Sequence, residues 1–77
     1  MEYEITVDEN VSSSKDKPTF DVDLVAWDRF GGGMKHSRGF GITKSEAQTV
    51  VKKQARLYNA YVTYKTPEIE KFYQGGD

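Results

Sequence analysis

A strand gives way to a helix at Phe40-Gly41-Ile42-Thr43-Lys44-Ser45-Glu46-Ala47, the stretch that decides the fold of this chain. Thr43 and Glu46 have the spacing of a capping box, in which the Thr43 hydroxyl accepts from the Glu46 amide and the Glu46 carboxylate reaches back. The spacing predicts a helix from here to about Asn59. Its inward stripe consists of Ala47, Val50, Val51, Gln54, Leu57 and Tyr58.

Three strands are expected before this helix, because apolar and polar residues alternate with a period of two. Residues 2–8 place on one side Tyr3, Ile5 and Val7. Residues 19–27, after a polar loop at 9–18, place on one side Phe20, Val22, Leu24 and Ala26. A glycine-rich turn at 28–33 leads into a strand at 35–42, whose shared face carries His36, Arg38, Phe40 and Ile42.

Two short elements are expected after the helix. Residues 61–65 indicate a fourth strand, with continuation of the helix as the alternative. Thr66-Pro67-Glu68 is typical of a second helix start, with Pro at the first helical position and an acid in the first turn. That helix would bury Ile69 and Phe72 and stop at Gly75-Gly76. The sequence therefore predicts an α+β fold, with a three- or four-stranded, mainly antiparallel sheet and one principal helix packed on one face.

Length and composition limit the classes of protein. The chain has 77 residues and no cysteine, which predicts a single domain over residues 1–77 without disulfides or thiolate metal sites. Five Tyr, four Phe and one Trp in so small a domain leave apolar surface to bury, so we expect a homodimer. No stretch is apolar enough to span a membrane, and the start Met1-Glu2-Tyr3-Glu4 is acidic, unlike a signal peptide. We expect a cytoplasmic protein.

Charge is divided along the chain, although the formal net charge is only −1. Residues 1–28 carry eight acids against two lysines, a net −6, and residues 29–56 carry seven bases against one acid, a net +6. Such a division bears on association with partners rather than on the fold.

The acids of the first segment are expected to share a surface. If the first two strands pair, alternation brings to the face away from the helix Glu2, Glu4, Asp8, Asp21 and Asp23, with Val25 and Trp27 as apolar anchors. One interpretation is a solvated face that keeps the protein in solution. The other is a docking surface for a basic, nucleic-acid-binding protein, with the carboxylates standing in for phosphates, so that the protein acts as an inhibitor.

The bases supply the alternative function, which is direct binding of DNA or RNA through phosphate contacts. On the hairpin these candidates are Arg29, Lys35, His36 and Arg38, and on the helix Lys44, Lys52, Lys53 and Arg56. Residues at a spacing of four are predicted to line the outer face of the helix, with Lys53 alongside: Lys44, Gln48, Lys52 and Arg56. A solvated lysine-rich helix is the other interpretation. A third function, an assembly subunit that pairs acidic with basic faces between copies, also fits the division of charge.

Catalysis, metal binding and cofactors are not expected. The one histidine, His36, lies between Lys35 and Arg38, a cationic setting that suits it poorly as a general base. Gly31-Gly32-Gly33-Met34-Lys35 departs from a phosphate-binding loop, which needs Gly directly before Lys and a helix after it. Asp21 and Asp23 lack the glycine and distal acid of a calcium loop.

Residues 39–47, with the preceding hairpin, resemble the strand-to-helix junction of Arm-type (AP2-like) integrase DNA-binding domains. They are also similar to the last strand and final helix of double-stranded-RNA-binding domains. The resemblance covers residues 19–58 and implies a nucleic-acid-binding hairpin and helix. The chain departs from both families, since Asp21 and Asp23 replace a basic sheet face and residues 2–8 indicate a strand where the RNA-binding family has a helix. In its small size and acidic sheet, the chain resembles phage-encoded DNA-mimic inhibitors.

Overall fold

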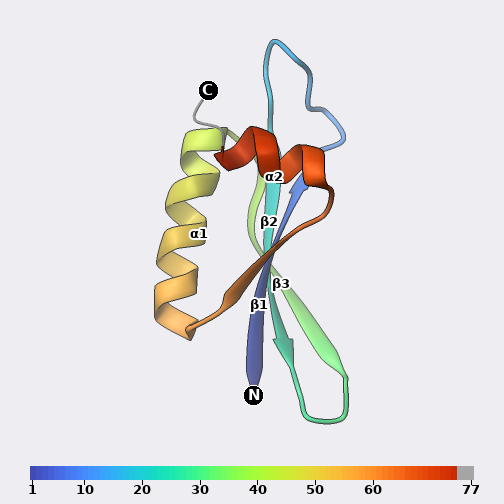
Figure 1. Cartoon of the computed structure of the whole chain (residues 1–77), viewed down its shortest axis with the longest axis vertical. Helices are drawn as coiled ribbons and strands as arrows, with labels where there is room; N and C mark the ends of the chain where they lie inside the picture. The colour runs from blue at the N-terminus through green and yellow to red at the C-terminus, as the bar shows by residue number, and fades with distance from the viewer. Residues whose placement is uncertain (75–77) are drawn as a thin grey trace.

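A four-stranded sheet carries both helices on one of its faces (Figure 1). The computed structural model describes residues 1–74. The elements in chain order are β1 (Glu2–Glu9), β2 (Phe20–Trp27), β3 (Gly33–Ile42), α1 (Lys44–Tyr58), β4 (Tyr61–Tyr64) and α2 (Pro67–Gln74). The predicted α+β fold is confirmed, and residues 61–64 form a strand rather than a continuation of α1. No helix in the described part of the chain is long and apolar enough to cross a membrane.

The strand order is β3-β2-β1-β4. β1 pairs with β2, and β2 with β3, in antiparallel fashion, whereas β4 pairs with β1 in parallel. β3 and β4 therefore run in the same direction at opposite edges of the sheet. Because parallel strands need a crossover connection, α1 carries the chain across the sheet from one edge to the other. The β2–β3 hairpin extends past the end of α1, and the loop at 10–19 extends at the other end of the sheet (Figure 1).

The core lies between the sheet and the two helices. The inward positions of β1 and β2 and four helix residues are buried there: Ile5, Val7, Phe20, Val22, Leu24, Ala47, Val51, Ile69 and Tyr73. The alternation predicted for both strands is thus confirmed. At about 25 cal/mol per Å² of apolar surface, this two-layer core is the main source of stability.

The capping box forms as the sequence predicts. The Thr43 hydroxyl accepts from the Glu46 amide at 3.2 Å, and the Glu46 carboxylate accepts from the Thr43 amide at 3.0 Å. That backbone hydrogen bond is the larger cause that lowers the pKa of Glu46, and the Thr43 hydroxyl adds to it. The helix is capped at Asn59, whose left-handed backbone (φ 50°) turns the following Ala60 amide back to donate to the Ala55 carbonyl at 3.1 Å.

The predicted inward stripe of α1 is right for Ala47 and Val51 but wrong for Leu57, which is 64% exposed. Ala55, which the stripe omitted, packs against the core instead. In α2 the buried aromatic residue is Tyr73, and Phe72 stays 39% exposed while its ring stacks on Phe20 at 5.8 Å. The predicted stop at Gly75-Gly76 lies outside the described residues.

Two one-residue bulges in β3 change which side chain faces the core. The pairing with β2 is regular from Trp27↔Gly33 to Asp23↔Ser37, and then shifts twice before Phe20↔Ile42. Ile42 therefore packs against the core, and Phe40 is 75% exposed. The prediction that Phe40 and Ile42 share a face is wrong because each extra residue reverses the alternation. Gly41 supplies the positive φ of 62° that the second shift uses.

Replacing Thr43 by Ala tests the cap. We expect a loss of about 1 kcal/mol in unfolding free energy, which lowers the Tm by about 4–8 °C. The measurement is thermal unfolding followed by circular dichroism. Thr49→Ala is the matched control, because this exposed hydroxyl only bonds back to the Ser45 carbonyl within the helix and its loss should be nearly neutral. Equal destabilisation by both variants would contradict the assignment of the cap.

The same cap predicts that the unfolding free energy depends on pH. Since the pKa of Glu46 is lower in the folded chain, its contribution is present above the unfolded pKa and is lost as the pH falls through the folded pKa. The stability difference between wild type and Thr43→Ala should therefore narrow in acid.

Candidate functional site

The outer face of the sheet, on the side away from α1 and α2, carries every acid that the sequence assigned to it. The register pairs Glu2 with Trp27, Glu4 with Val25, Thr6 with Asp23 and Asp8 with Asp21. Within residues 1–74, no other element covers this face. We call the acidic face the set formed by Glu2, Glu4, Asp8, Asp21, Asp23, Val25 and Trp27.

Three of these carboxylates are held by contacts within the chain. Glu4 accepts from the indole N–H of Trp27 at 2.9 Å, which fixes the ring against β1. Asp23 pairs with the Lys35 ammonium at 3.6 Å. Asp21 accepts two bonds at one oxygen, from the side-chain amide of Asn10 at 2.8 Å and from the backbone amide of Gly41 at 2.9 Å.

Asp21 is therefore a structural residue as well as a member of the acidic face. Asn10 is 5% exposed and its own side-chain oxygen accepts from the Ser12 amide. The Asp21 carboxylate thus links the start of the 10–19 loop and the β3 bulge at Gly41 to β2, an inner strand of the sheet. The sequence shows Asp21 as a surface acid, and only the folded chain shows these two bonds.

Glu2 and Asp8, at the two ends of β1, make the weakest contacts of the five acids. Within residues 1–74, Asp8 accepts a hydrogen bond only from the neighbouring Glu9 amide, and it lies directly opposite Asp21. Glu2 accepts a long bond of 3.4 Å from the Tyr61 hydroxyl. The pKa of Tyr61 is raised, first by desolvation and then by the charges of Glu4 and Glu2. The negative charges of Glu2 and Glu4 on β1 thus act on Tyr61 of the edge strand β4.

A shallow hollow of about 350 Å³ lies on this face. It is lined by Glu4, Thr6, Val25, Trp27, Gly33, Lys35, Thr63 and Lys65. The sequence did not predict that Thr63 and Lys65 lie on this face, because nothing local in the sequence shows that β4 pairs in parallel with β1. Lys35, grouped by the sequence with the basic hairpin, belongs instead to the acidic face and is bonded to Asp23.

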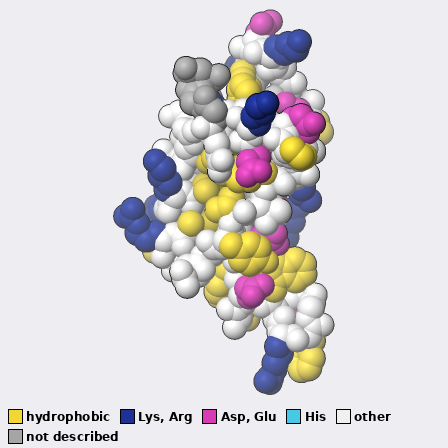
Figure 2. All heavy atoms as spheres, viewed as in Figure 1, with side chains coloured by type: hydrophobic (Ala, Val, Ile, Leu, Met, Phe, Trp, Pro, Cys, Tyr) yellow, Lys and Arg dark blue, Asp and Glu magenta, His cyan; other side chains and the backbone are white. Residues whose placement is uncertain are grey.

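The bases that the sequence grouped as one nucleic-acid-binding surface lie on several parts of the molecule. Arg29 is in the hairpin turn, and its guanidinium lies 5.5 Å from the Phe30 ring. Arg38 is on the helix side, where its Nε donates to the Gln54 side chain at 3.1 Å. On the face seen in Figure 2, Lys and Arg side chains occupy separate places, most of them near the outline of the molecule, rather than one patch.

The bases of α1 do not form one outer row. Lys52, Lys53 and Arg56 are exposed, but the Lys44 ammonium is buried, lies 4.9 Å from the Phe72 ring and has no acceptor among residues 1–74. Gln48 likewise donates to the Tyr73 carbonyl of α2 at 3.0 Å. The prediction of an outward Lys44 is wrong because four residues advance about 40° beyond a full helical turn. The row therefore winds from the α2 side to solvent.

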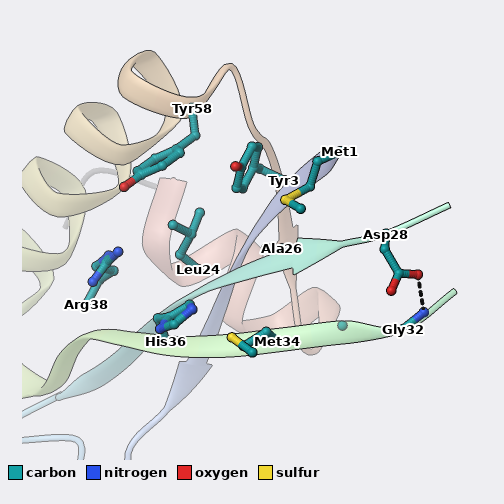
Figure 3. A pocket seen from close by; sticks show the side chains of 11 residues that line it. Met1, Tyr3, Leu24, Ala26, Asp28, Gly32, Met34, His36, Arg38 and Tyr58 are labelled. Carbon is teal, nitrogen blue, oxygen red and sulfur yellow. Dashed lines mark hydrogen bonds between the residues drawn. The ribbon is translucent and has the colours of Figure 1, made fainter. Parts of the chain in front are cut away.

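A larger hollow, of about 540 Å³, lies on the helix side beyond the end of α1 (Figure 3). Apolar side chains line most of it, including Met1, Tyr3, Leu24 and Met34, with His36 and Arg38 along β3. Asp28, at its rim, is already used as an acceptor for the Phe30 and Gly32 amides of the turn. His36 makes no hydrogen bond to a carboxylate within residues 1–74, so this hollow has no acid–base pair.

Within residues 1–74, no group of three or more His, Cys, Asp or Glu side chains is placed to hold a metal ion. In the comparisons with known proteins, no family model, no curated protein and no solved structure matches this chain. The family resemblances drawn from residues 19–58 stay predictions.

A comparison of Asp21→Ala with Asp8→Ala tests the structural role of Asp21. Asp21→Ala removes two hydrogen bonds to a charged group. Their loss should lower the unfolding free energy by about 2 kcal/mol and the Tm by roughly 10 °C. Asp8→Ala should change stability by less than about 0.5 kcal/mol, since it also relieves the repulsion with Asp21. Chemical denaturation of both variants makes the measurement. If Asp8→Ala proves the more damaging, the assignment of roles to this pair is incorrect.

Proposed function

We propose that this protein is a non-catalytic inhibitor whose acidic face docks on a basic, nucleic-acid-binding protein and competes with its DNA or RNA. One observation carries the proposal: the acids gather on a single uncovered face, whereas the bases are spread over the hairpin turn, the acidic face itself, the helix side and α1. The five acids thus share one face, on which Lys35 and Lys65 also lie, and the exposed bases of α1 form a smaller group of three, Lys52, Lys53 and Arg56.

The acidic face has the physical features of a docking surface. Residues two apart on a strand repeat about every 6.6 Å along one face, so Glu2 and Glu4, and likewise Asp21 and Asp23, present regularly spaced charges. Trp27 is fixed by its bond to Glu4. Val25 is only 8% exposed and offers a partner little contact area, so Trp27 rather than Val25 is the apolar anchor of this face. A ring that is already ordered loses little conformational entropy when a partner covers it. Charges at the rim would speed encounter with a cationic protein.

Direct nucleic-acid binding is less well supported. Lys35 is neutralised by Asp23, Lys44 is buried beneath α2, and Arg38 is bonded to Gln54. A duplex laid against Lys35 would also meet the carboxylates of Asp23 and Glu4. Homodimer formation, the absence of enzymatic activity and a cytoplasmic location stay predictions that accompany the proposal.

Reversal of the two acids with the weakest contacts tests the acidic face. In a double variant Glu2→Lys with Asp8→Lys, affinity for a cationic partner should fall at least about tenfold, or 1.4 kcal/mol, because the surface now repels it. Asp21 and Glu4 are kept because their bonds support the fold. The matched control is Glu68→Lys with Glu70→Lys on α2, which makes the same change in net charge on exposed positions of the helix side.

The binding experiment uses all three proteins, immobilised and exposed to nuclease-treated lysate of the source cells. A protein retained by wild type and control, and lost on the double variant, is then purified and bound to labelled nucleic acid. We expect wild type to displace the label stoichiometrically, and the double variant to fail. If the retained protein does not bind nucleic acid, or if the control loses it equally, the proposed function is rejected.

The alternative has its own test in the salt dependence of duplex binding. Each phosphate neutralised contributes about −0.9 to the slope of log K against log salt. With the bases dispersed, we expect no measurable binding of a short DNA or RNA duplex at physiological salt in a fluorescence polarisation titration. Tight binding with a slope of about −3 or steeper would reverse the ranking of the two functions.

A further inference from the structure

β3 is an edge strand whose outer side has no partner strand within residues 1–74. Its first half is regular, and the pairs from Trp27↔Gly33 to Asp23↔Ser37 keep one register with β2. The Asp28 amide donates to the Gly32 carbonyl at 2.8 Å, so hydrogen-bonded pairs recur at every second position from there. The backbone N–H and C=O groups of Gly33, Lys35 and Ser37 consequently point away from β2, and form an open row that an extended chain can pair with.

The charged side chains on the helix side of this edge are basic. No acid occurs from Arg29 to Ser45. β3 carries His36 and Arg38 on the helix side, whereas Lys35 lies on the other face, where it pairs with Asp23. A second copy of β3 added in antiparallel fashion would place these bases against one another, which disfavours self-pairing. An acidic strand would find complementary charge instead.

An exposed apolar side chain and two basic ones lie on the helix side of this edge. Met34 is 64% exposed, and the Arg38 guanidinium donates to the Gln54 side chain of α1 at 3.1 Å. Figure 3 shows Met34, His36 and Arg38 in a row along β3, with Tyr58 of α1 on the same side of the sheet.

We propose that the edge of β3 binds an extended, acidic segment of a partner protein, which adds as a fifth strand by main-chain pairing. Side chains at alternate positions of the added strand lie on the helix side of the sheet. An apolar one lies beside Met34, and acidic ones lie beside His36 and Arg38. This surface is separate from the acidic face, so the two proposals stand or fall independently.

A designed peptide is the probe. Thr-Leu-Thr-Glu-Thr-Glu-Thr, tested with its reversed sequence because the direction of pairing is open, puts the apolar and acidic side chains on one side of a strand. The shuffled peptide Thr-Thr-Leu-Glu-Glu-Thr-Thr has the same composition without the alternation, and a peptide with Lys for Glu reverses the charge. We expect one acidic alternating peptide to saturate with a Kd below about 1 mM. Backbone NMR shifts should map to β3.

Variants separate main-chain pairing from charge. Ser37→Pro removes an outward amide at a position where an edge strand tolerates Pro, and should weaken binding at least about tenfold. Ser37→Ala, which keeps that amide, should bind like wild type. His36→Glu with Arg38→Glu should lose the acidic peptide and gain the Lys peptide, whereas Lys52→Glu, on the exposed side of α1, should change neither. The charge swap keeps the test decisive if Ser37→Pro does not fold.

Several results would overturn the proposal: no binding of either alternating peptide, equal binding of the shuffled or Lys peptide, or unchanged binding by the charge-swapped variant. Sedimentation of the peptide-free protein adds one more outcome. A dimer that Ser37→Pro dissociates and Ser37→Ala retains would show that a second copy occupies the edge. Binding that survives in Glu2→Lys with Asp8→Lys separates this surface from the acidic face.

Discussion

The packing of both helices on one face of the sheet is the constraint on which the rest of the structure depends. β4 lies parallel to β1 at the far edge from β3, so the chain has to cross the sheet, and α1 makes that crossing over the apolar sides of β1 and β2. α2 then packs beside α1 on the same face, joined to it by the bond from Gln48 to the Tyr73 carbonyl. The other face is left to its own side chains. Its polar groups have to be satisfied by one another, by water or by a partner.

The acidic face meets this requirement only in part. Asp21 bonds to Asn10 and Gly41, Glu4 to Trp27, and Asp23 to Lys35, so that three carboxylates contribute to the fold. Glu2 and Asp8 are less engaged, and Asp8 also lies opposite Asp21. Like charges on neighbouring strands are unfavourable in the free protein. A cationic partner would relieve that repulsion, which is the physical basis of the proposed function.

The two proposed surfaces differ in the interaction that gives affinity. On the acidic face, side-chain charge and the ordered Trp27 ring act together, so binding should depend on salt and on charge. At the edge of β3, the main chain would supply the contacts, and Met34, His36 and Arg38 would select which extended segment binds. The acids of the first segment share one face of the sheet, whereas the bases of the second segment are spread over several parts of the molecule.

The sequence by itself determined the elements and most of the core. Period-two alternation identified β1 and β2 with their buried residues, and Thr43 with Glu46 marked the start of α1, because alternation and capping are local patterns that neighbouring residues define. It also placed the five acids on one face, since that inference needs only the alternation and the pairing of two strands.

Tertiary structure decided what depends on residues far apart in the chain. Because of the two bulges in β3, Ile42 rather than Phe40 packs against the core, and α2 covers the ammonium group of Lys44. Both outcomes depend on strand register and helix packing, which arise from contacts that no local pattern contains. The same holds for Lys65 and Thr63, which reach the acidic face only through the parallel pairing of β4 with β1. Asp21 gained its structural role in this way too, since its two donors come from positions 10 and 41 and meet it only when three segments of the chain come together.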